Sequence, residues 1–244
     1  MPEKKKNTIH IGTSGWNYKH WKKNFYPEDL PQKKWLEFYY RKFKTVELNN
    51  SFYRLPEEKT FDNWKDRTPE DFIFSVKASR YITHIKKLND EEPLKEFLKR
   101  AKHLKEKLGP VLFQLPPGWK YNEERFDAFL KMLPDKYKYT FEFRNESWWN
   151  EKVIHKLKDH NIAFCIFEIG EKISPKEITA DFIYVRLHGP GAPYQGSYNK
   201  KTLEEWADYF YEWSNKGKEI WCYFDNDQEG FAAENASQLQ EIIL

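Results

Sequence analysis

Cysteine is nearly absent from this chain of 244 residues, which contains only two, Cys165 and Cys222. Both lie inside apolar, strand-like runs, so a disulfide-rich secreted scaffold and a zinc ribbon are excluded. The chain starts with MPEKKKNTIHIG, which is basic but lacks the apolar segment of a secretory signal peptide. We therefore expect a cytoplasmic protein with two buried, unreactive thiols.

Long hydrophobic runs are also absent, and the mean hydropathy is −0.92. A membrane-spanning helix needs about 20 consecutive apolar residues, so we expect no membrane partner. Low hydropathy can indicate disorder, but 18% of the residues are aromatic, which is too many for a disordered chain. The net charge of +3, from 41 basic and 38 acidic residues, permits a polyanionic partner without requiring one.

Eight short runs of strand-forming residues recur along the chain, and helical patterns fill most of the gaps between them. The runs cover residues 8–12, 45–48, 72–77, 111–115, 139–144, 163–168, 182–188 and 220–224. Their spacing of about 30 residues matches one strand–helix repeat. We predict an α/β fold, a single domain over residues 1–244 built as a TIM (β/α)8 barrel with eight parallel strands. An open, doubly wound sheet is the alternative, but no G-x-G-x-x-G motif follows the first run.

The helical patterns between the strands are uneven. Apolar residues at helical spacing predict one helix over residues 94–108, ended by Gly109. A second helix is predicted over residues 203–213, after a capping box made by Thr202 and Glu205. The segment after the sixth strand holds at most a short helical turn, so we expect the helix there to be weak or missing.

Polar side chains alternate with apolar ones along the predicted strands. The apolar set must face the outer helices, which places the polar set inside the barrel, near the C-terminal strand ends where TIM-barrel sites form. The inward-facing residues are Glu47, Asn49, Lys77, Gln114, Glu142, Arg144, Arg186, His188 and, after the eighth strand, Asp225 or Asn226. Burying so many charges is costly unless they are paired or bound to a ligand. An ion-pair layer that satisfies itself and a polar ligand pocket both explain the pattern, and we favour the pocket.

Two carboxylates in this set suggest acid–base chemistry. Glu47 and Glu142 could act as general acid and base across a bound substrate, with His188 polarising an oxygen. Equally, each carboxylate could neutralise a neighbouring cation. A metal could use these three residues and Asp225, but His188 is the only histidine at an inward strand end. We therefore expect no metal and no other cofactor, although a divalent ion is the natural alternative.

The loop after the first strand, GTSGWNYKHWKKNFYP, interleaves aromatic rings with lysines. Rings between cations suit stacking on bases or sugars beside phosphates, and equally the rings could simply cover one end of the barrel. A long, glycine-rich loop after the seventh strand, HGPGAPYQGSYNK, is a candidate lid. The predicted ligand-binding residues in the first loop are Thr13, Ser14, Trp16, Tyr18 and Trp21.

Seven ordered motifs resemble those of the DUF72 family of YecE-like proteins: GTSGWNYKHW, VELNNSFYRLP, FSVKASRYITH, LGPVLFQLPPGW, EFRNESWW, YVRLHGP and CYFDNDQEGFAAENA. The resemblance covers almost the entire chain and implies a TIM-like barrel, similar to the xylose-isomerase and endonuclease-IV type. It suggests a DNA-binding or nuclease-like role, although this sequence lacks the histidine-rich metal cluster of the endonuclease-IV type. The motif positions that carry over are Thr13, Ser14, Gly15, Trp16, Glu47, Asn49, Lys77, Gln114, Glu142, Arg144, Arg186, His188 and Asn226.

Three functions are consistent with these residues. The leading hypothesis is binding, with or without processing, of single-stranded nucleic acid or a nucleotide-like phosphorylated small molecule. Phosphate would be held by Lys77, Arg144 and Arg186, and bases would stack on Trp16, Tyr18 and Trp21. The alternative is a sugar or sugar-phosphate isomerase or hydrolase that uses Glu47 and Glu142. The third is a non-catalytic scaffold whose aromatic loops bind another protein. The sequence does not determine the oligomeric state.

Overall fold

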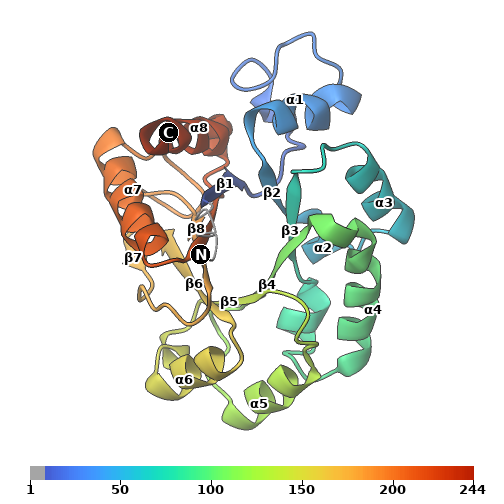
Figure 1. Ribbon diagram of the computed structural model, residues 1–244, viewed down its shortest axis with the longest axis vertical. Helices are drawn as coiled ribbons and strands as arrows, with labels where there is room; N and C mark the ends of the chain where they lie inside the picture. The colour runs from blue at the N-terminus through green and yellow to red at the C-terminus, as the bar shows by residue number, and fades with distance from the viewer. Residues whose placement is uncertain (1–8) are drawn as a thin grey trace, which may run out of the picture.

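A computed structural model describes residues 9–244, and within that range eight parallel strands form a barrel inside a ring of helices (Figure 1). The barrel strands are β1 (Ile9–Thr13), β2 (Thr45–Leu48), β3 (Ile73–Lys77), β4 (Leu108–Leu115), β5 (Tyr139–Phe143), β6 (Ala163–Ile169), β8 (Phe182–Leu187) and β9 (Glu219–Phe224). They pair in the order β1-β9-β8-β6-β5-β4-β3-β2. The predicted TIM-like barrel is therefore confirmed.

The barrel closes where β1 meets β2. Here a single bridge joins Ser14 to Glu47, and the Gly15 amide donates a hydrogen bond to the Glu47 carbonyl at 2.8 Å. Gly12 lets the two strands approach, because a Cβ there would lie only 2.3 Å from the Thr45 carbonyl oxygen. The closure is thus narrow, and it lies directly beside the polar strand ends.

Helices cover the outside of the barrel, and no helix of the described chain is long and apolar enough to cross a membrane. The α-helices are α1 (Trp35–Lys42), α2 (Asn50–Tyr53), α3 (Glu58–Asp66), α4 (Glu91–Ala101), α5 (Glu123–Met132), α6 (Glu151–Asp159), α7 (Lys200–Asn215) and α8 (Phe231–Ile243). Short 3-10 helices are η1 (Lys19–Trp21), η2 (Gln32–Lys34), η4 (Lys102–Lys107), η5 (Glu146–Trp148) and η6 (Gln228–Gly230), and η3 (Tyr81–Ile85) is a π-helix.

The unit after β6 has no α-helix, as the sequence predicted. In its place, the two-residue strand β7 (Lys172–Ile173) turns back and pairs antiparallel with the end of β6. The sequence did not predict this short strand. An irregular segment without a helix then connects β7 to β8.

Two predicted helix boundaries were wrong. The helix predicted to reach Leu108 is an α-helix, α4, only to Ala101, and the 3-10 helix η4 continues it to Lys107 with a break at Lys105. Gly109 does not end this helix but lies inside β4. Gly109 is needed for strand packing, because a Cβ there would lie 2.7 Å from the Ile73 side chain. The predicted Thr202/Glu205 capping box is also absent: α7 begins earlier, and the Asn199 side chain accepts a hydrogen bond from the Thr202 amide at 2.9 Å.

The strand alternation sorts side chains as the sequence predicted. Most of the apolar core lies between the strands and the helices, where residues such as Val46, Phe74 and Phe141 are fully buried. A second apolar cluster contains Leu112, Ala163, Cys165, Ala180, Phe182, Tyr184, Trp221 and Tyr223. Both cysteines are buried and free.

Two tyrosines of the second cluster connect it to the polar strand ends. The Tyr223 hydroxyl lies 2.6 Å from Thr45 Oγ1 and 2.7 Å from Ser75 Oγ, which ties β9 to β2 and β3. The Tyr184 hydroxyl donates to Glu47 Oε2 at 2.7 Å. The polar residues at the strand ends are therefore joined to the apolar interior by two hydrogen-bonded tyrosines.

Candidate functional site

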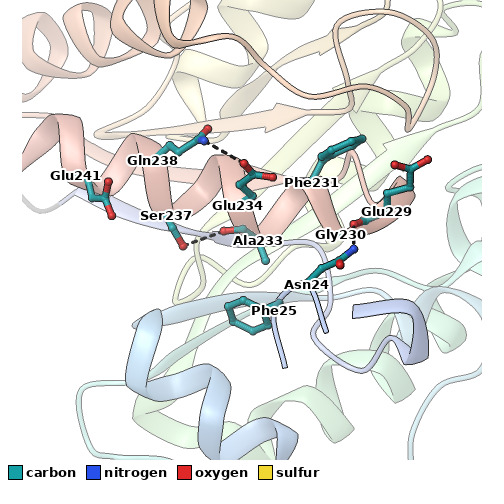
Figure 2. A pocket seen from close by; sticks show the side chains of 10 residues that line it. All are labelled: Asn24, Phe25, Glu229, Gly230, Phe231, Ala233, Glu234, Ser237, Gln238 and Glu241. Carbon is teal, nitrogen blue, oxygen red and sulfur yellow. Dashed lines mark hydrogen bonds between the residues drawn. The ribbon is translucent and has the colours of Figure 1, made fainter. Parts of the chain in front are cut away.

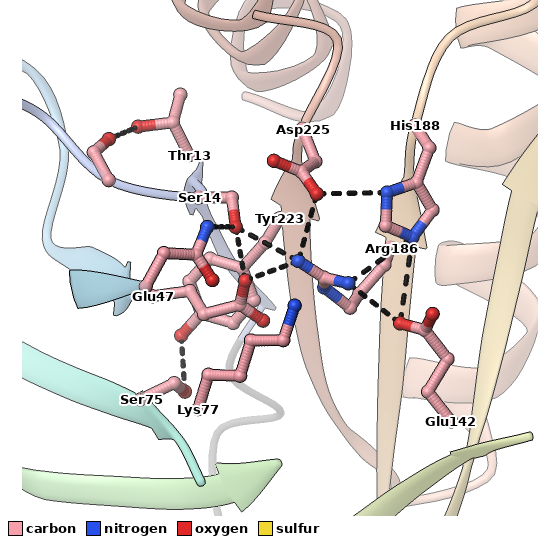
Figure 3. Close-up of polar contacts among 12 residues, drawn as sticks. Thr13, Ser14, Glu47, Ser75, Lys77, Glu142, Arg186, His188, Tyr223 and Asp225 are labelled. Atoms are coloured by element: carbon pink, nitrogen blue, oxygen red, sulfur yellow. Dashed lines mark hydrogen bonds and ion pairs between the residues drawn. The ribbon is translucent and has the colours of Figure 1, made fainter. Parts of the chain in front are cut away.

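Arg186, at the end of β8, organises the polar strand ends (Figure 3). Its guanidinium is fully buried and donates to Glu47 Oε1 at 2.7 Å, Glu142 Oε2 at 2.7 Å and Asp225 Oδ2 at 3.0 Å. One cation therefore serves three carboxylates from different strand ends. Charge-assisted hydrogen bonds of this kind are stronger than those between neutral groups.

These contacts keep the carboxylates of Glu142 and Asp225 ionised. Burial alone would raise the pKa of Glu142, but Arg144 and Arg186 outweigh it and hold that pKa well below its ordinary value. Burial opposes the ionised form of Asp225 too, and Arg186 together with His188 lowers its pKa. The anions are thus stabilised by fixed cations, as the self-satisfied layer considered from the sequence requires.

His188 links two sides of this network. Its Nδ1 lies 2.9 Å from Asp225 Oδ2, and its Nε2 lies 2.9 Å from the Arg144 guanidinium, which can only donate. We therefore assign the ring proton to Nδ1, with Nε2 as acceptor. Arg144 also donates to Glu142 and stacks 4.9 Å from the centre of the Phe167 ring. Both side chains are occupied within the network.

Ser14 and Asn49 complete the network at the β1–β2 closure. The Ser14 hydroxyl donates to Glu47 and accepts hydrogen bonds from Asn49 Nδ2 and, at 3.0 Å, from Arg186. In contrast, Asn49 Oδ1 is a buried acceptor without a hydrogen-bond partner among the described residues.

Lys77, at the end of β3, is the exception among the buried charges. Its side chain is 8% exposed, and its amine forms no ion pair or hydrogen bond with any part of residues 9–244. The amine lies 4.4 Å from the centre of the Phe52 ring and points into the network in Figure 3 without reaching a partner. Burial, followed by repulsion from Arg186, lowers the pKa of Lys77 from 10.5 to about 8.

A cavity of about 340 Å³ opens beside this lysine, at the C-terminal end of the barrel. Its volume is within the range of small-molecule sites. The lining residues are Tyr18, Asn49, Tyr53, Lys77, Tyr194, Asp225 and Asp227. Burial raises the pKa of Asp227 to about 6, even though Trp21 and His20 contact its carboxylate. The cavity thus combines an unpaired amine, carboxylates and phenols.

The sequence matches, over residues 10–244, the family described as "Protein of unknown function DUF72". The chain belongs to the DUF72 family. The UPF0759 protein YunF of Bacillus subtilis is 28% identical over 270 residues, which cover 96% of this chain and 94% of YunF. The UPF0759 protein YecE of Escherichia coli K12 is 29% identical over 143 residues, which cover 58% of this chain and 50% of YecE.

Solved DUF72 structures have the same fold. A DUF72 family protein (TM1631) from Thermotoga maritima superimposes with a TM-score of 0.88 at 29% identity, over 97% of this chain and 99% of the other. A DUF72 protein from Enterococcus faecalis gives a TM-score of 0.82 at 20% identity, over 97% of this chain and 95% of the other. The family description states no activity, so the function of this DUF72 chain has to be argued from its site.

Ten of the predicted site residues come together around the mouth of this DUF72 barrel. They are Ser14, Tyr18, Glu47, Asn49, Lys77, Glu142, Arg144, Arg186, His188 and Asp225. The cavity also uses Tyr53, Tyr194 and Asp227, which were not among the predicted ligand-binding residues. Tyr53 ends the short helix α2, and Tyr194 lies in the glycine-rich loop after β8. Period-2 alternation does not extend beyond the strands and could not orient them.

The two tryptophans predicted to stack on bases are not available for that role. Trp21 is 0% exposed, and its indole donates to Asp227 Oδ1 at 2.6 Å. It therefore holds a residue that lines the cavity, but it does not line the cavity itself. Trp16 packs edge-on against Trp64, with ring centres 5.6 Å apart, and lies outside the mouth cavity. The loop rings largely cover the barrel end, which was the simpler of the two interpretations.

Three further predicted ligand-binding residues have structural contacts instead. Thr13 Oγ1 donates to the Gly15 carbonyl at 2.6 Å, and Gln114 Nε2 donates to the Leu115 carbonyl at 3.0 Å. Asn226 is buried, and its Nδ2 donates a hydrogen bond to the Gly196 carbonyl at 2.9 Å. This bond fixes the loop before α7. Asp225 continues the alternation of β9 on the side of Trp221 and Tyr223 and so reaches the network, whereas Asn226 lies on the opposite side.

A second, larger cavity of about 610 Å³ lies along α8, outside the barrel (Figure 2). Glutamates 229, 234 and 241 line it, together with two phenylalanines and small polar side chains. Its lining has no cation, whereas the mouth cavity joins both charge signs. Within residues 9–244, no group of three or more histidine, cysteine, aspartate or glutamate side chains is arranged to hold a metal ion. We therefore take the mouth cavity as the candidate site.

Proposed function

We propose that this DUF72 protein is an enzyme that binds a small, polar, uncharged molecule of about monosaccharide size in the mouth of its barrel. The observation that carries this proposal is the unpaired amine of Lys77 on a cavity of about 340 Å³, beside a network in which the other buried charges are paired. A buried charge without a partner costs stability, and such costs are typical of functional sites.

The charge of the cavity favours an uncharged ligand over a phosphorylated one. Its lining carries one cation, Lys77, and two carboxylates, Asp225 and Asp227. The guanidinium groups that could have bound phosphate are occupied by carboxylates. The exposed phenol groups of Tyr53 and Tyr194 offer the hydrogen-bond partners that a polyhydroxylated molecule requires.

The acid–base roles considered for Glu47 and Glu142 are not supported. Both carboxylates are fully buried, and Arg186 lies between them, so a substrate does not fit across the pair. Their contacts favour a positioning role, in which they hold Arg186 and, through it, Asp225. His188 has the same role, because it fixes Asp225 from the other side. The groups that face the cavity are better candidates for contact with substrate.

Binding of single-stranded nucleic acid is the second candidate, and the rim of the mouth favours it. Tyr53 is 82% exposed and Tyr81 is 44% exposed, and each adjoins an exposed arginine, Arg54 or Arg80. Exposed rings beside cations suit base stacking next to phosphate. Fluorescence anisotropy with a short oligonucleotide at low salt tests this candidate. Binding that weakens with salt and is lost in Tyr53→Ala with Tyr81→Ala supports it.

A thermal-shift screen tests the main proposal. Neutral sugars and polyols should raise the melting temperature, and sugar phosphates and mononucleotides should not. A ligand at 100 times its Kd stabilises the folded state by about 2.7 kcal/mol. The Lys77→Met variant should lose this ligand-induced shift, measured against its own melting temperature. Lys102→Met, on the exposed surface of η4, is the matched control and should keep it. Stabilisation by nucleotides alone, or an unchanged shift in Lys77→Met, contradicts the proposal.

A further inference from the structure

We infer that the Lys77 amine forms an imine with the carbonyl group of a small substrate bound in the mouth cavity. This inference rests on the proposed function, because it requires that the cavity takes a small polar molecule. Lys77 lies on the cavity wall, at the end of β3 and over the Phe52 ring. The site would therefore select an aldehyde or ketone among polyhydroxylated molecules.

A comparison with Lys107 shows why Lys77 is suited to this chemistry. The side chain of Lys107 is also buried, at 4% exposure, but its amine donates to the Lys65 carbonyl and the Thr68 carbonyl, each at 2.7 Å. Its donors are used by the fold. Lys77 has no such acceptor among the described residues, because Arg186 already holds the surrounding carboxylates. The nitrogen of Lys77 is free to meet a ligand.

The surroundings of Lys77 also favour its nucleophilic form. An amine attacks a carbonyl only through its unprotonated lone pair, and desolvation beside another cation is a known means of producing that form. With the pKa of Lys77 lowered to about 8, roughly a tenth of the amine is unprotonated at pH 7. A solvent-exposed lysine is about 300-fold less deprotonated at that pH.

The step balances without an oxidant or a metal. The Lys77 nitrogen adds to the carbonyl carbon, and one amine proton moves to the former carbonyl oxygen to give a carbinolamine. The second amine proton then leaves the nitrogen, and the hydroxyl departs as water after taking up one proton, which leaves the C=N bond. Asp227 lines the same cavity and can deliver that proton, since burial raises its pKa to about 6. Hydrolysis reverses the step and releases the amine.

Reductive trapping tests the inference on the full chain. The protein is incubated with glyceraldehyde and sodium cyanoborohydride at pH 7, and modification is measured for each lysine by peptide mass spectrometry. Lys77 should be modified at least ~10-fold faster than exposed Lys102, because its unprotonated fraction exceeds that of an ordinary lysine. It should also be modified faster than Lys107, whose pKa is lowered by burial too but whose amine is held by the Lys65 and Thr68 carbonyls. Its rate should rise with pH to a midpoint near 8. Modification of Lys77 no faster than that of Lys102 overturns the inference.

Two further measurements separate this inference from the proposed function. Acetic anhydride reports general amine reactivity, so a Lys77 that is preferred by the anhydride but not by glyceraldehyde overturns imine formation. Sorbitol, which has no carbonyl group, reports binding alone. Stabilisation by sorbitol without trapping of glyceraldehyde rejects the imine and retains the proposed function, whereas failure of both rejects both. In Lys77→Arg, which keeps the charge, the modification of other lysines should be unchanged.

Discussion

Arg186 and Lys77 are both buried cations at strand ends of one barrel, yet their surroundings are opposite. Arg186, on β8, contacts three carboxylates within 3.0 Å. Lys77, on β3, contacts a phenylalanine ring and a cavity. The part of the mouth around Arg186, which we call the closed half, is filled by ion pairs with Glu47, Glu142 and Asp225. The part around Lys77 and the cavity, the open half, has no such pairs among the described residues. Under the proposed function, the unpaired charge marks the site, and buried charge by itself does not.

Removing the central cation of the closed half should have the largest effect. Arg186→Met leaves three buried carboxylates without their shared partner, and breaking a buried ion pair costs about 3–5 kcal/mol. Urea unfolding at pH 7 measures the loss. Arg41→Met is the control, because Arg41 forms only an exposed pair with Glu37, and we expect a change below about 0.5 kcal/mol. A loss below about 1 kcal/mol in Arg186→Met would mean that the closed half is not held by its charges.

Acid should weaken the same half. The pKa values of Glu142 and Asp225 are lower in the folded state than in the unfolded chain. Their stabilising contribution is therefore present above the unfolded pKa values of about 4 and is lost as the pH falls through the folded values. Unfolding free energies between pH 7 and pH 3 should decrease in the wild type. The decrease should be shallower in Arg186→Met, and parallel curves would contradict the comparison.

In the open half, removing the cation should stabilise the protein. We expect Lys77→Met to raise the unfolding free energy by about 1–3 kcal/mol at pH 7, because the lowered pKa of Lys77 measures the cost of burying its charge. The cost is complete below the folded pKa of about 8 and disappears as the pH rises toward the unfolded value of 10.5. The difference between variant and wild type should therefore shrink from pH 7 to pH 10. A destabilised variant at pH 7 would show that Lys77 is paired.

The smallest effect on stability is expected at the outer rim of the open half. Tyr53 is 82% exposed, so Tyr53→Ala should change the unfolding free energy by less than about 0.5 kcal/mol. The same variant should weaken the sugar-induced thermal shift, because Tyr53 lines the cavity. Tyr211→Ala, an exposed tyrosine on α7, is the control for the loss of a surface ring and should leave the shift intact. Equal shifts in both variants would exclude Tyr53 from the site.

Periodicity predicted the parts of the molecule that depend on neighbouring residues along the chain. Eight strands, their inward polar positions and the missing helix after β6 all followed from local pattern, because successive side chains of a strand point to opposite faces. Local pattern predicted the ends of helices and strands less well. Gly109 looked like the end of a helix but lies in a strand, where β3 approaches too closely for a side chain.

Local sequence pattern predicts which charges face the inside of the barrel, whereas the closed barrel sets which charges pair with one another. Glu47 and Glu142 are 95 positions apart, and both contact Arg186 because β2, β5 and β8 converge in the closed barrel. The same convergence buries Trp21 and leaves Lys77 without a carboxylate. Alternation fixes the face on which a side chain lies, whereas distances across the barrel depend on its closure, which no local pattern encodes.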